Sequence, residues 1–287
     1  MNWLNRDLIL QIEPTRKCNL NCKICMRQNL NKKNVQLSFE NFKKVLNFGN
    51  FRHVCLHGWG EPLLNSQIFQ MIEYAESQGI STELTTNGTL LKENLEKIFD
   101  SGLSIIVFGI HNKKILLSIF PQIKELIEKR NKERLKKPKI YMDIVIYKEN
   151  LNQILDLIKI TSQLNIDAIV LHRLFKVHPN VNYISVKEER ELFKKAKKLA
   201  KELKIKLYLP PKPSIPCVAV RYSIFVTVEG KITPCPYLLE LYLGNVFNHD
   251  DTKNIYLKKI NFIKNMNKNP ICNNKCPLGS RNGKFYC

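Results

Sequence analysis

Short apolar runs alternate with longer amphipathic stretches through the first two-thirds of the sequence. Each run has the length of a strand, and the stretches between them carry apolar residues at helical spacing. The runs that we interpret as strands are Leu8–Glu13, His53–His57, Ser81–Thr85, Ser104–Ile110, Ile140–Ile146, Ala168–Leu171 and Lys206–Leu209. Strands that alternate with helices predict an α/β fold, with a parallel sheet and helices packed outside it.

The helices between these strands begin and end at residues typical of helix termini. Ser38 precedes one helix, and Asn65 opens another that stops at Gly79. Leu91–Phe99 and Ile154–Leu164 are two more. Six such β-α units predict a partial (β/α)6 barrel, in which the chemistry lies at the C-terminal ends of the strands.

The alternation stops at Pro210-Pro211-Lys212-Pro213, which can continue neither a helix nor a central strand. After it, Ser223–Val228 and Lys231–Thr233 are joined by Glu229-Gly230 and predict a hairpin. We therefore expect two domains, residues 1–209 and 210–287. The second is too small for much of a core, and a bound metal would stabilise it.

Composition changes how the cysteines are interpreted. Hydrophobic residues make up 44% of the 287 residues, no stretch has the length of a membrane span, and no secretory signal opens the chain. We therefore expect a cytoplasmic protein, where clustered thiols usually bind metal rather than form disulfides. Cys55 stands alone in an apolar run and is expected to be a buried structural thiol. The other eight cysteines form two groups: Cys18, Cys22 and Cys25, and Cys217, Cys235, Cys272, Cys276 and Cys287.

The formal net charge is +21, from 46 Lys and Arg against 25 Asp and Glu. Such an excess suits a nucleic acid, a phosphorylated substrate or an anionic membrane surface. The excess is spread along the chain, however, and its densest run, Lys124–Lys139, also contains glutamates. We interpret it as a solvated surface, with a nucleic-acid partner as the less favoured alternative.

The first cysteine group follows the first strand with the spacing C-x3-C-x2-C, from Cys18 through Cys22 to Cys25. Three thiolates on one short loop can hold a [4Fe–4S] cluster and leave its fourth iron open to a ligand. Structural zinc prefers four ligands, commonly as two separated pairs, and is the less favoured alternative.

This spacing after the first strand of an α/β barrel resembles the radical SAM superfamily of enzymes. The resemblance implies that S-adenosylmethionine (SAM) chelates the open iron and that the reduced cluster gives it one electron. SAM then yields methionine and a 5′-deoxyadenosyl radical that abstracts hydrogen from a substrate. The resemblance also implies an electron donor such as ferredoxin or flavodoxin.

Gly58-Trp59-Gly60-Glu61-Pro62 is similar to the Gly-Gly-Glu-Pro element of that family, with Trp59 interposed. Glycines there let the backbone approach a ligand closely, and Glu61 can accept hydrogen bonds from the SAM amino group. Thr85-Thr86-Asn87-Gly88 resembles the polar end of strand three, although Asn-Gly is also a plain turn. The candidate SAM contacts are Gly58, Gly60, Glu61, Pro62, Thr86, Asn87, Asn150 and Arg173.

Two positions depart from the family pattern. Ile24 stands between the last two cysteines of the first group, where relatives often have an aromatic residue, and Gly109 takes the place of a serine after strand four. Lys113 or Lys114 could hold the SAM carboxylate instead. We interpret His111 as a packed or surface histidine.

The stretch from Val228 to Cys235, followed by Gly244-Asn245-Val246, resembles the SPASM/twitch extension of radical SAM enzymes, which carries auxiliary [4Fe–4S] clusters. Five cysteines fit one cluster, so the shortened, twitch-like form is the better match. The ligands would be Cys217, Cys235, Cys272 and Cys276, or Cys287 would be the fourth ligand and one of Cys272 and Cys276 would stay free. A structural zinc site is the alternative. The full set of candidate ligands is Cys217, Cys235, Cys272, Cys276 and Cys287.

The resemblance specifies how the reaction starts better than it specifies the substrate. We expect an oxidoreductase-type reaction on a small molecule, because no peptide-recognition module precedes the first strand near Leu8. A maturase of peptide or protein side chains, a tRNA-modifying enzyme and a non-catalytic iron–sulfur electron carrier are the alternatives.

Overall fold

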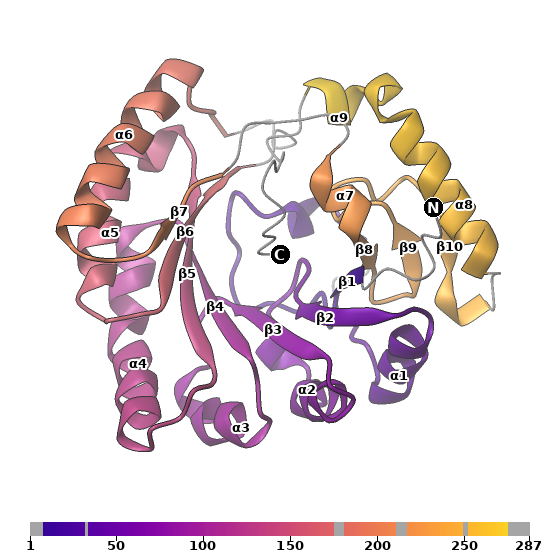
Figure 1. Cartoon of the computed structure of the whole chain (residues 1–287), viewed down its shortest axis with the longest axis horizontal. Helices are drawn as coiled ribbons and strands as arrows, with labels where there is room; N and C mark the ends of the chain where they lie inside the picture. The colour runs from indigo at the N-terminus through magenta and orange to yellow at the C-terminus, as the bar shows by residue number, and fades with distance from the viewer. Residues whose placement is uncertain (1–7, 32–33, 175–180, 211–216, 249–251, 275–287) are drawn as a thin grey trace. The chain divides into compact units, whose positions relative to one another are not determined.

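The chain forms two units according to its internal contacts, one of Met1–Leu84 with Pro211–Cys287 and one of Thr85–Pro210 (Figure 1). The structure is a computed structural model that describes residues 8–31, 34–174, 181–210, 217–248 and 252–274. In each unit the strands are mostly parallel, so the predicted α/β class is confirmed.

The first unit contains the strands at both ends of the sequence. Its strands lie in the order β10-β9-β8-β1-β2-β3. β1 pairs in parallel with both β2 and β8, whereas β9 pairs antiparallel with β8 and β10. The strand bounds are β1 Leu8–Ile12, β2 Phe51–Leu56, β3 Ser81–Thr86, β8 Ser223–Val226, β9 Lys231–Thr233 and β10 Gly244–Asn245.

Helices α1 and α2 bury apolar stripes in this unit, and α1 begins at Ser38 as expected, because the Ser38 hydroxyl accepts a hydrogen bond from the Asn41 amide at 3.2 Å. The α-helices are α1 Phe39–Asn47, α2 Ile68–Ser77, α7 Val218–Tyr222, α8 Thr252–Lys264 and α9 Pro270–Asn274. The 3-10 helices are η2 Met26–Asn29, η3 Pro62–Leu64, η6 Val246–Asn248 and η7 Met266–Lys268.

The second unit has a parallel sheet in the order β4-β5-β6-β7, and α4, α5 and α6 cover one of its faces (Figure 1). Its strands are β4 Ile105–Ile110, β5 Lys139–Ile146, β6 Ala168–Arg173 and β7 Leu207–Tyr208. Its helices are η4 Lys92–Asn94, α3 Leu95–Asp100, α4 Lys113–Lys132, η5 Lys148–Gln153, α5 Ile154–Ser162 and α6 Val186–Glu202.

All seven predicted strands of the first two-thirds are present, with small differences at their ends. The predicted hairpin is present as β8 and β9, and β8 also pairs with β1. The reason is that Ile224, Phe225 and Val226 are all buried, which a two-stranded hairpin alone does not allow. The second unit ends at Pro210, next to the expected boundary, and the division into domains 1–209 and 210–287 stays a prediction.

Within the residues that the structure describes, no helix combines the length and the apolar character needed to cross a membrane.

Candidate active site

Cys18, Cys22 and Cys25 lie on the loop between β1 and η2, where each is half-buried and outside any disulfide. The Cys25 amide donates a hydrogen bond to the Cys22 carbonyl at 3.1 Å, and the Leu20 amide donates to the Cys18 sulfur at 3.4 Å. The Cys25 thiol lies 3.9 Å from the Trp59 carbonyl oxygen. The loop therefore holds the three thiols in one place, as the spacing predicts.

Burial and the neighbouring thiols favour the protonated forms of Cys22 and Cys25. Burial, followed by the neighbouring Cys25 and Cys18, raises the pKa of Cys22 to about 11. Burial also raises the pKa of Cys25. Three thiolates can share this site only when a bound cation compensates their charge, and an iron–sulfur cluster held by three cysteines supplies that charge. The donor set fits the cluster that the sequence predicts.

A buried ion pair fixes the backbone just ahead of this loop. Arg16 Nε lies 3.1 Å from Glu13 Oε2, and the Glu13 side chain is fully buried. Glu13 also accepts a hydrogen bond from the Val228 amide, while Arg16 reaches Glu229 at 3.3 Å. Burial raises the pKa of Glu13 although Arg16 opposes this shift. The pair ties the start of the cysteine loop to the turn after β8.

The glycines of Gly58-Trp59-Gly60 permit close contact with the cysteine loop. A Cβ atom on Gly60 would lie 2.2 Å from the Thr15 carbonyl oxygen, and one on Gly58 would lie 2.7 Å from the Glu13 side chain. The Glu61 amide donates to the Lys17 carbonyl at 2.7 Å. The close approach is thus to the backbone that carries the cysteines, and contact of these glycines with SAM stays a prediction.

Glu61 and Pro62 start the short helix η3. Glu61 is buried and accepts a hydrogen bond from the Leu63 amide at 3.1 Å, and Pro62 occupies the first turn. Trp59, the residue inserted into the family pattern, packs edge-on against Tyr237 with ring centroids 5.5 Å apart. The role of Glu61 as an acceptor for SAM stays a prediction.

Thr86 and Asn87 form the turn that ends β3. The Gly88 amide donates to the Thr86 hydroxyl at 3.1 Å, and Asn87 Oδ1 accepts from the Thr89 amide at 2.9 Å. Gly88 has a φ of +77°, a conformation that favours glycine. The segment therefore forms a turn, and SAM binding by Thr86 and Asn87 stays a prediction.

Asn150 and Arg173 have protein partners. Asn150 donates to the carbonyls of His111 and Val145 at 2.8 and 2.7 Å, which joins the ends of β4 and β5. Arg173 Nη2 donates to Glu189 Oε1 on α6 at 2.9 Å. These contacts account for both side chains locally, and their expected contact with SAM stays a prediction.

The departures from the family pattern also have clear places. Among the described residues, a Cβ atom on Gly109 would meet only the Thr86 carbonyl oxygen, at an ordinary 3.9 Å. Lys113 and Lys114 are exposed at the start of α4. His111 is half-buried, and burial lowers its pKa, in agreement with a packed histidine. Ile24 is half-buried on the cysteine loop.

Three C-terminal cysteines gather in one hydrophobic cluster. Cys217 is buried with Val220 and Met266, and Cys235 and Cys272 pack against the same group. Burial, followed by the neighbouring Cys217, raises the pKa of Cys272 to about 11. Thiols from α7, the segment after β9 and α9 therefore converge, whereas Cys276 and Cys287 lie outside the described residues.

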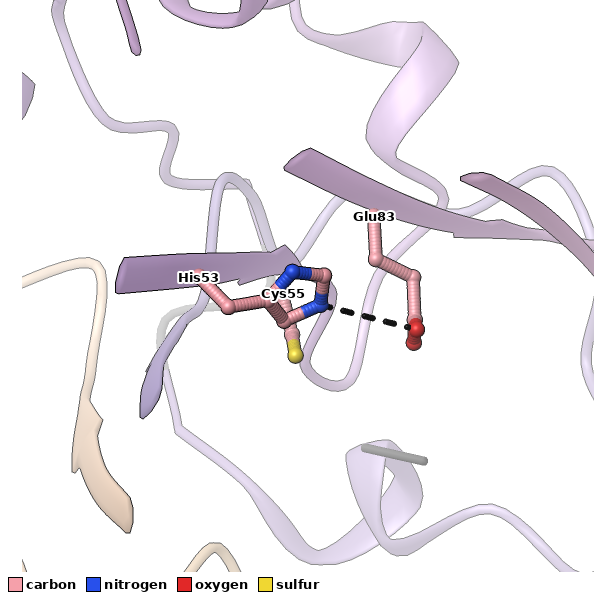
Figure 2. A group of neighbouring side chains, drawn as sticks. All are labelled: His53, Cys55 and Glu83. Carbon is pink, nitrogen blue, oxygen red and sulfur yellow. Dashed lines mark ion pairs between the residues drawn. The ribbon is translucent and has the colours of Figure 1, made fainter. Parts of the chain in front are cut away.

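His53 on β2 and Glu83 on β3 belong to a polar group that was not expected from the sequence (Figure 2). His53 Nε2 lies 3.7 Å from Glu83 Oε2, and one ligand atom from each of His53, Cys55 and Glu83 lies within 4.8 Å of the others. Cys55 is fully buried, as expected, but its sulfur is part of a disulfide, so the expectation of a free structural thiol is wrong. A disulfide sulfur is not a thiolate ligand, so His53 and Glu83 supply the donor types of this group that suit a metal ion such as zinc. The available signal was the placement of His53 and Cys55 at alternate positions of β2, which puts both side chains on one face of the strand.

Comparisons with known proteins agree with these features. A cofactor-modifying protein for tungsten-containing aldehyde ferredoxin oxidoreductase from Pyrococcus furiosus is 26% identical over 270 residues, which cover 86% of this chain and 76% of the relative. A probable GTP 3′,8-cyclase from Sulfolobus acidocaldarius is 28% identical over 256 residues, which cover 79% and 80%.

Among solved structures, SuiB from Streptococcus suis bound to S-adenosylmethionine matches with a TM-score of 0.68 and 18% identity. The match covers 86% of this chain and 65% of SuiB, so the chain spans about two-thirds of the length of that protein. The likeness concerns the fold. The family model of the radical SAM superfamily matches residues 12–178, more than half of the chain, and the protein therefore belongs to the radical SAM superfamily of enzymes.

Proposed function

We propose that this radical SAM enzyme oxidises a small molecule and that its C-terminal cysteines bind a second [4Fe–4S] cluster. The observation that carries the proposal is the convergence of Cys217, Cys235 and Cys272 in one buried cluster. A second support is that this cluster belongs to the same unit of the fold as Cys18, Cys22 and Cys25. Cys276 or Cys287 would be the fourth ligand.

The residues around the first cysteine group hold the loop in a fixed shape. A [4Fe–4S] cluster on Cys18, Cys22 and Cys25 would supply one electron for cleavage of SAM into methionine and a 5′-deoxyadenosyl radical. The Glu13–Arg16 pair and the close approach of Gly60 to Thr15 keep the loop from moving when ligands bind. Ferredoxin or flavodoxin would be the electron donor.

A purine ribonucleotide is the first candidate for the substrate. The two sequence relatives, which align over about four-fifths of the chain, are named for action on a cofactor and on GTP. A peptide is the second candidate, since the structural relative SuiB has also been solved with its precursor peptide SuiA. The shared fold carries less weight here than the sequence relatives, because one fold serves many substrates.

Metal analysis of anaerobically purified protein tests the two clusters. We expect about eight irons per chain in the wild type and about four after replacement of either cysteine group by alanine. The matched control is Cys55→Ala, which should keep about eight. Four irons together with one zinc in the wild type would refute the second cluster.

The radical step is tested by incubating the dithionite-reduced enzyme with SAM and measuring 5′-deoxyadenosine. We expect the nucleoside from the wild type and none from the Cys18→Ala variant. GTP should raise the rate of its formation. No nucleoside from iron-loaded wild type would overturn the proposal, and a rate raised by peptides but not by GTP would favour the maturase.

A further inference from the structure

Asp143 and His172 lie on the face of the second unit's sheet that is turned away from α4, α5 and α6. Along β5, Ile140, Met142 and Ile144 are fully buried on the helix-covered face, so Asp143 points to the opposite side. On β6, the neighbouring Arg173 contacts Glu189 of α6, so His172 also points away from the helices.

The two side chains form a hydrogen-bonded pair across adjacent strands. The parallel register places Asp143 opposite Val170 and Val145 opposite His172, so the pair is diagonal on one face. His172 Nδ1 lies 3.2 Å from Asp143 Oδ2. The carboxylate thereby fixes the ring of His172 and turns its Nε2 atom away from β5.

Within the described residues, each partner keeps one polar atom without a hydrogen bond. Asp143 Oδ1 and His172 Nε2 are shielded from solvent, and the part of the chain that the structure describes offers neither of them a partner. The side chains themselves are 17% and 29% exposed, so the face is not sealed. Buried polar atoms are normally paired, and two neighbouring exceptions near the C-terminal end of a parallel strand indicate a ligand position.

The charge of the pair limits what the ligand can be. Burial and the neighbouring Arg173 lower the pKa of His172, but the Asp143 carboxylate opposes them and the net shift is upward. When His172 is protonated, its Nε2–H is a donor, and Asp143 Oδ1 is an acceptor. A group that both accepts and donates a hydrogen bond fits this arrangement, and a hydroxyl is the simplest one.

We propose that His172 and Asp143 bind a hydroxyl of the substrate, with His172 Nε2 in direct contact and Asp143 positioning the ring. This inference rests on the proposed function and deepens it, because the ribose of a purine ribonucleotide supplies such hydroxyls. The site belongs to strands β5 and β6, which carry none of the cysteine groups.

The test measures GTP binding to the iron-loaded, SAM-bound enzyme by anaerobic equilibrium dialysis. His172→Asn keeps an amide nitrogen near Nδ1 and loses the donor at Nε2, whereas His172→Gln places its amide nitrogen near Nε2. We expect about tenfold weaker binding for His172→Asn and binding within about threefold of the wild type for His172→Gln. A purely structural role for His172 would reverse this order, because only the Asn variant preserves the contact with Asp143.

The hydroxyl itself is tested with 2′,3′-dideoxy-GTP. The wild type should bind it about tenfold more weakly than GTP, and His172→Asn should bind the two nucleotides equally. Absence of GTP binding to the wild type, or the same preference in both proteins, would overturn the inference. The proposed function is judged separately, by the 5′-deoxyadenosine that the wild type forms from SAM in the absence of GTP.

Discussion

Lys259 offers a quantitative test of how the C-terminal part of the first unit is packed. It lies in α8 at 3% exposure, and its Nζ atom donates to the Ser223 carbonyl at 2.7 Å. Burial lowers the pKa of Lys259 from 10.5 to about 7. One hydrogen bond to a carbonyl does not replace the hydration of an ammonium group, which is why burial disfavours the charged form.

The sign of the pH dependence follows from proton binding in the two states. Between pH 7 and pH 10.5 the unfolded chain holds a proton on this lysine and the folded chain has lost it, so the lysine's contribution to stability becomes more favourable as pH rises. The full difference of 3.5 pKa units corresponds to about 5 kcal/mol of destabilisation at low pH. Between pH 6.5 and pH 8.5 the destabilisation falls from about 5 to about 3 kcal/mol.

Lys259→Met removes this charge while keeping a long side chain. Its cost is the lost hydrogen bond to the Ser223 carbonyl, about 1–3 kcal/mol. We therefore expect the variant to be about 2–3 kcal/mol more stable than the wild type at pH 6.5, with an advantage about 2 kcal/mol smaller at pH 8.5. Anaerobic urea denaturation followed by far-ultraviolet circular dichroism measures both differences.

The matched control is Lys258→Met, since Lys258 is the exposed neighbour in the same helix. Its stability should change by less than about 0.5 kcal/mol at either pH. A difference between Lys259→Met and the wild type that is independent of pH would refute the reasoning, because it would mean that Lys259 titrates like an exposed lysine. Lower stability of Lys259→Met at pH 6.5 would refute it as well.

Two further substitutions test the loop of the first cysteine group and the start of α6. Gly60→Ala places a Cβ atom 2.2 Å from the Thr15 carbonyl oxygen. We expect this variant to lose about half of its bound iron while its circular dichroism spectrum is unchanged. The control Gly109→Ala, whose Cβ atom has room, should keep all of its iron. Ser185→Ala removes a capping box in which the Ser185 hydroxyl accepts from the Glu188 amide, and it should lower the free energy of unfolding by about 1 kcal/mol; a change below about 0.2 kcal/mol would contradict the capping role.

The strands could be predicted because burial in the core decides which of their positions are apolar. In β4 and β5 the apolar residues at alternate positions are those that the helices bury, and the observed ends lie within about two residues of the expected ones. The cysteine loop could be predicted for a similar reason, since its spacing is local in sequence. Helix α6 begins at a recognisable capping pair, Ser185 and Glu188, but few buried apolar residues follow to mark it as a helix. They are Leu192, Ala196 and Ala200.

The SAM contacts expected from the family pattern could not be judged from the sequence, because hydrogen-bond partners are distant in sequence. Asn150 bonds to His111 and Val145, and Arg173 to Glu189, through contacts that no motif announces. The role of Gly60 is similar: its missing side chain is required by Thr15, a residue 45 positions earlier. A pattern of residue types can single out such a residue, but it does not identify the atoms that the residue contacts.

The sequence pattern did not identify polar residues that are buried, because it predicts such residues at the surface. Lys259 occupies a core position of α8 beside Ile255 and Tyr256, so the apolar stripe of that helix reads as broken. Asp143 and His172 could not be identified from the sequence either, because a polar residue at alternate strand positions usually indicates a solvated face. The structure separates the two cases by their hydrogen bonds. The amine of Lys259 has a carbonyl partner within the chain, so we interpret its burial as a loss of stability that the packing of α8 requires. The described part of the chain leaves Asp143 Oδ1 and His172 Nε2 unmatched, and this is the property expected of atoms that a substrate completes.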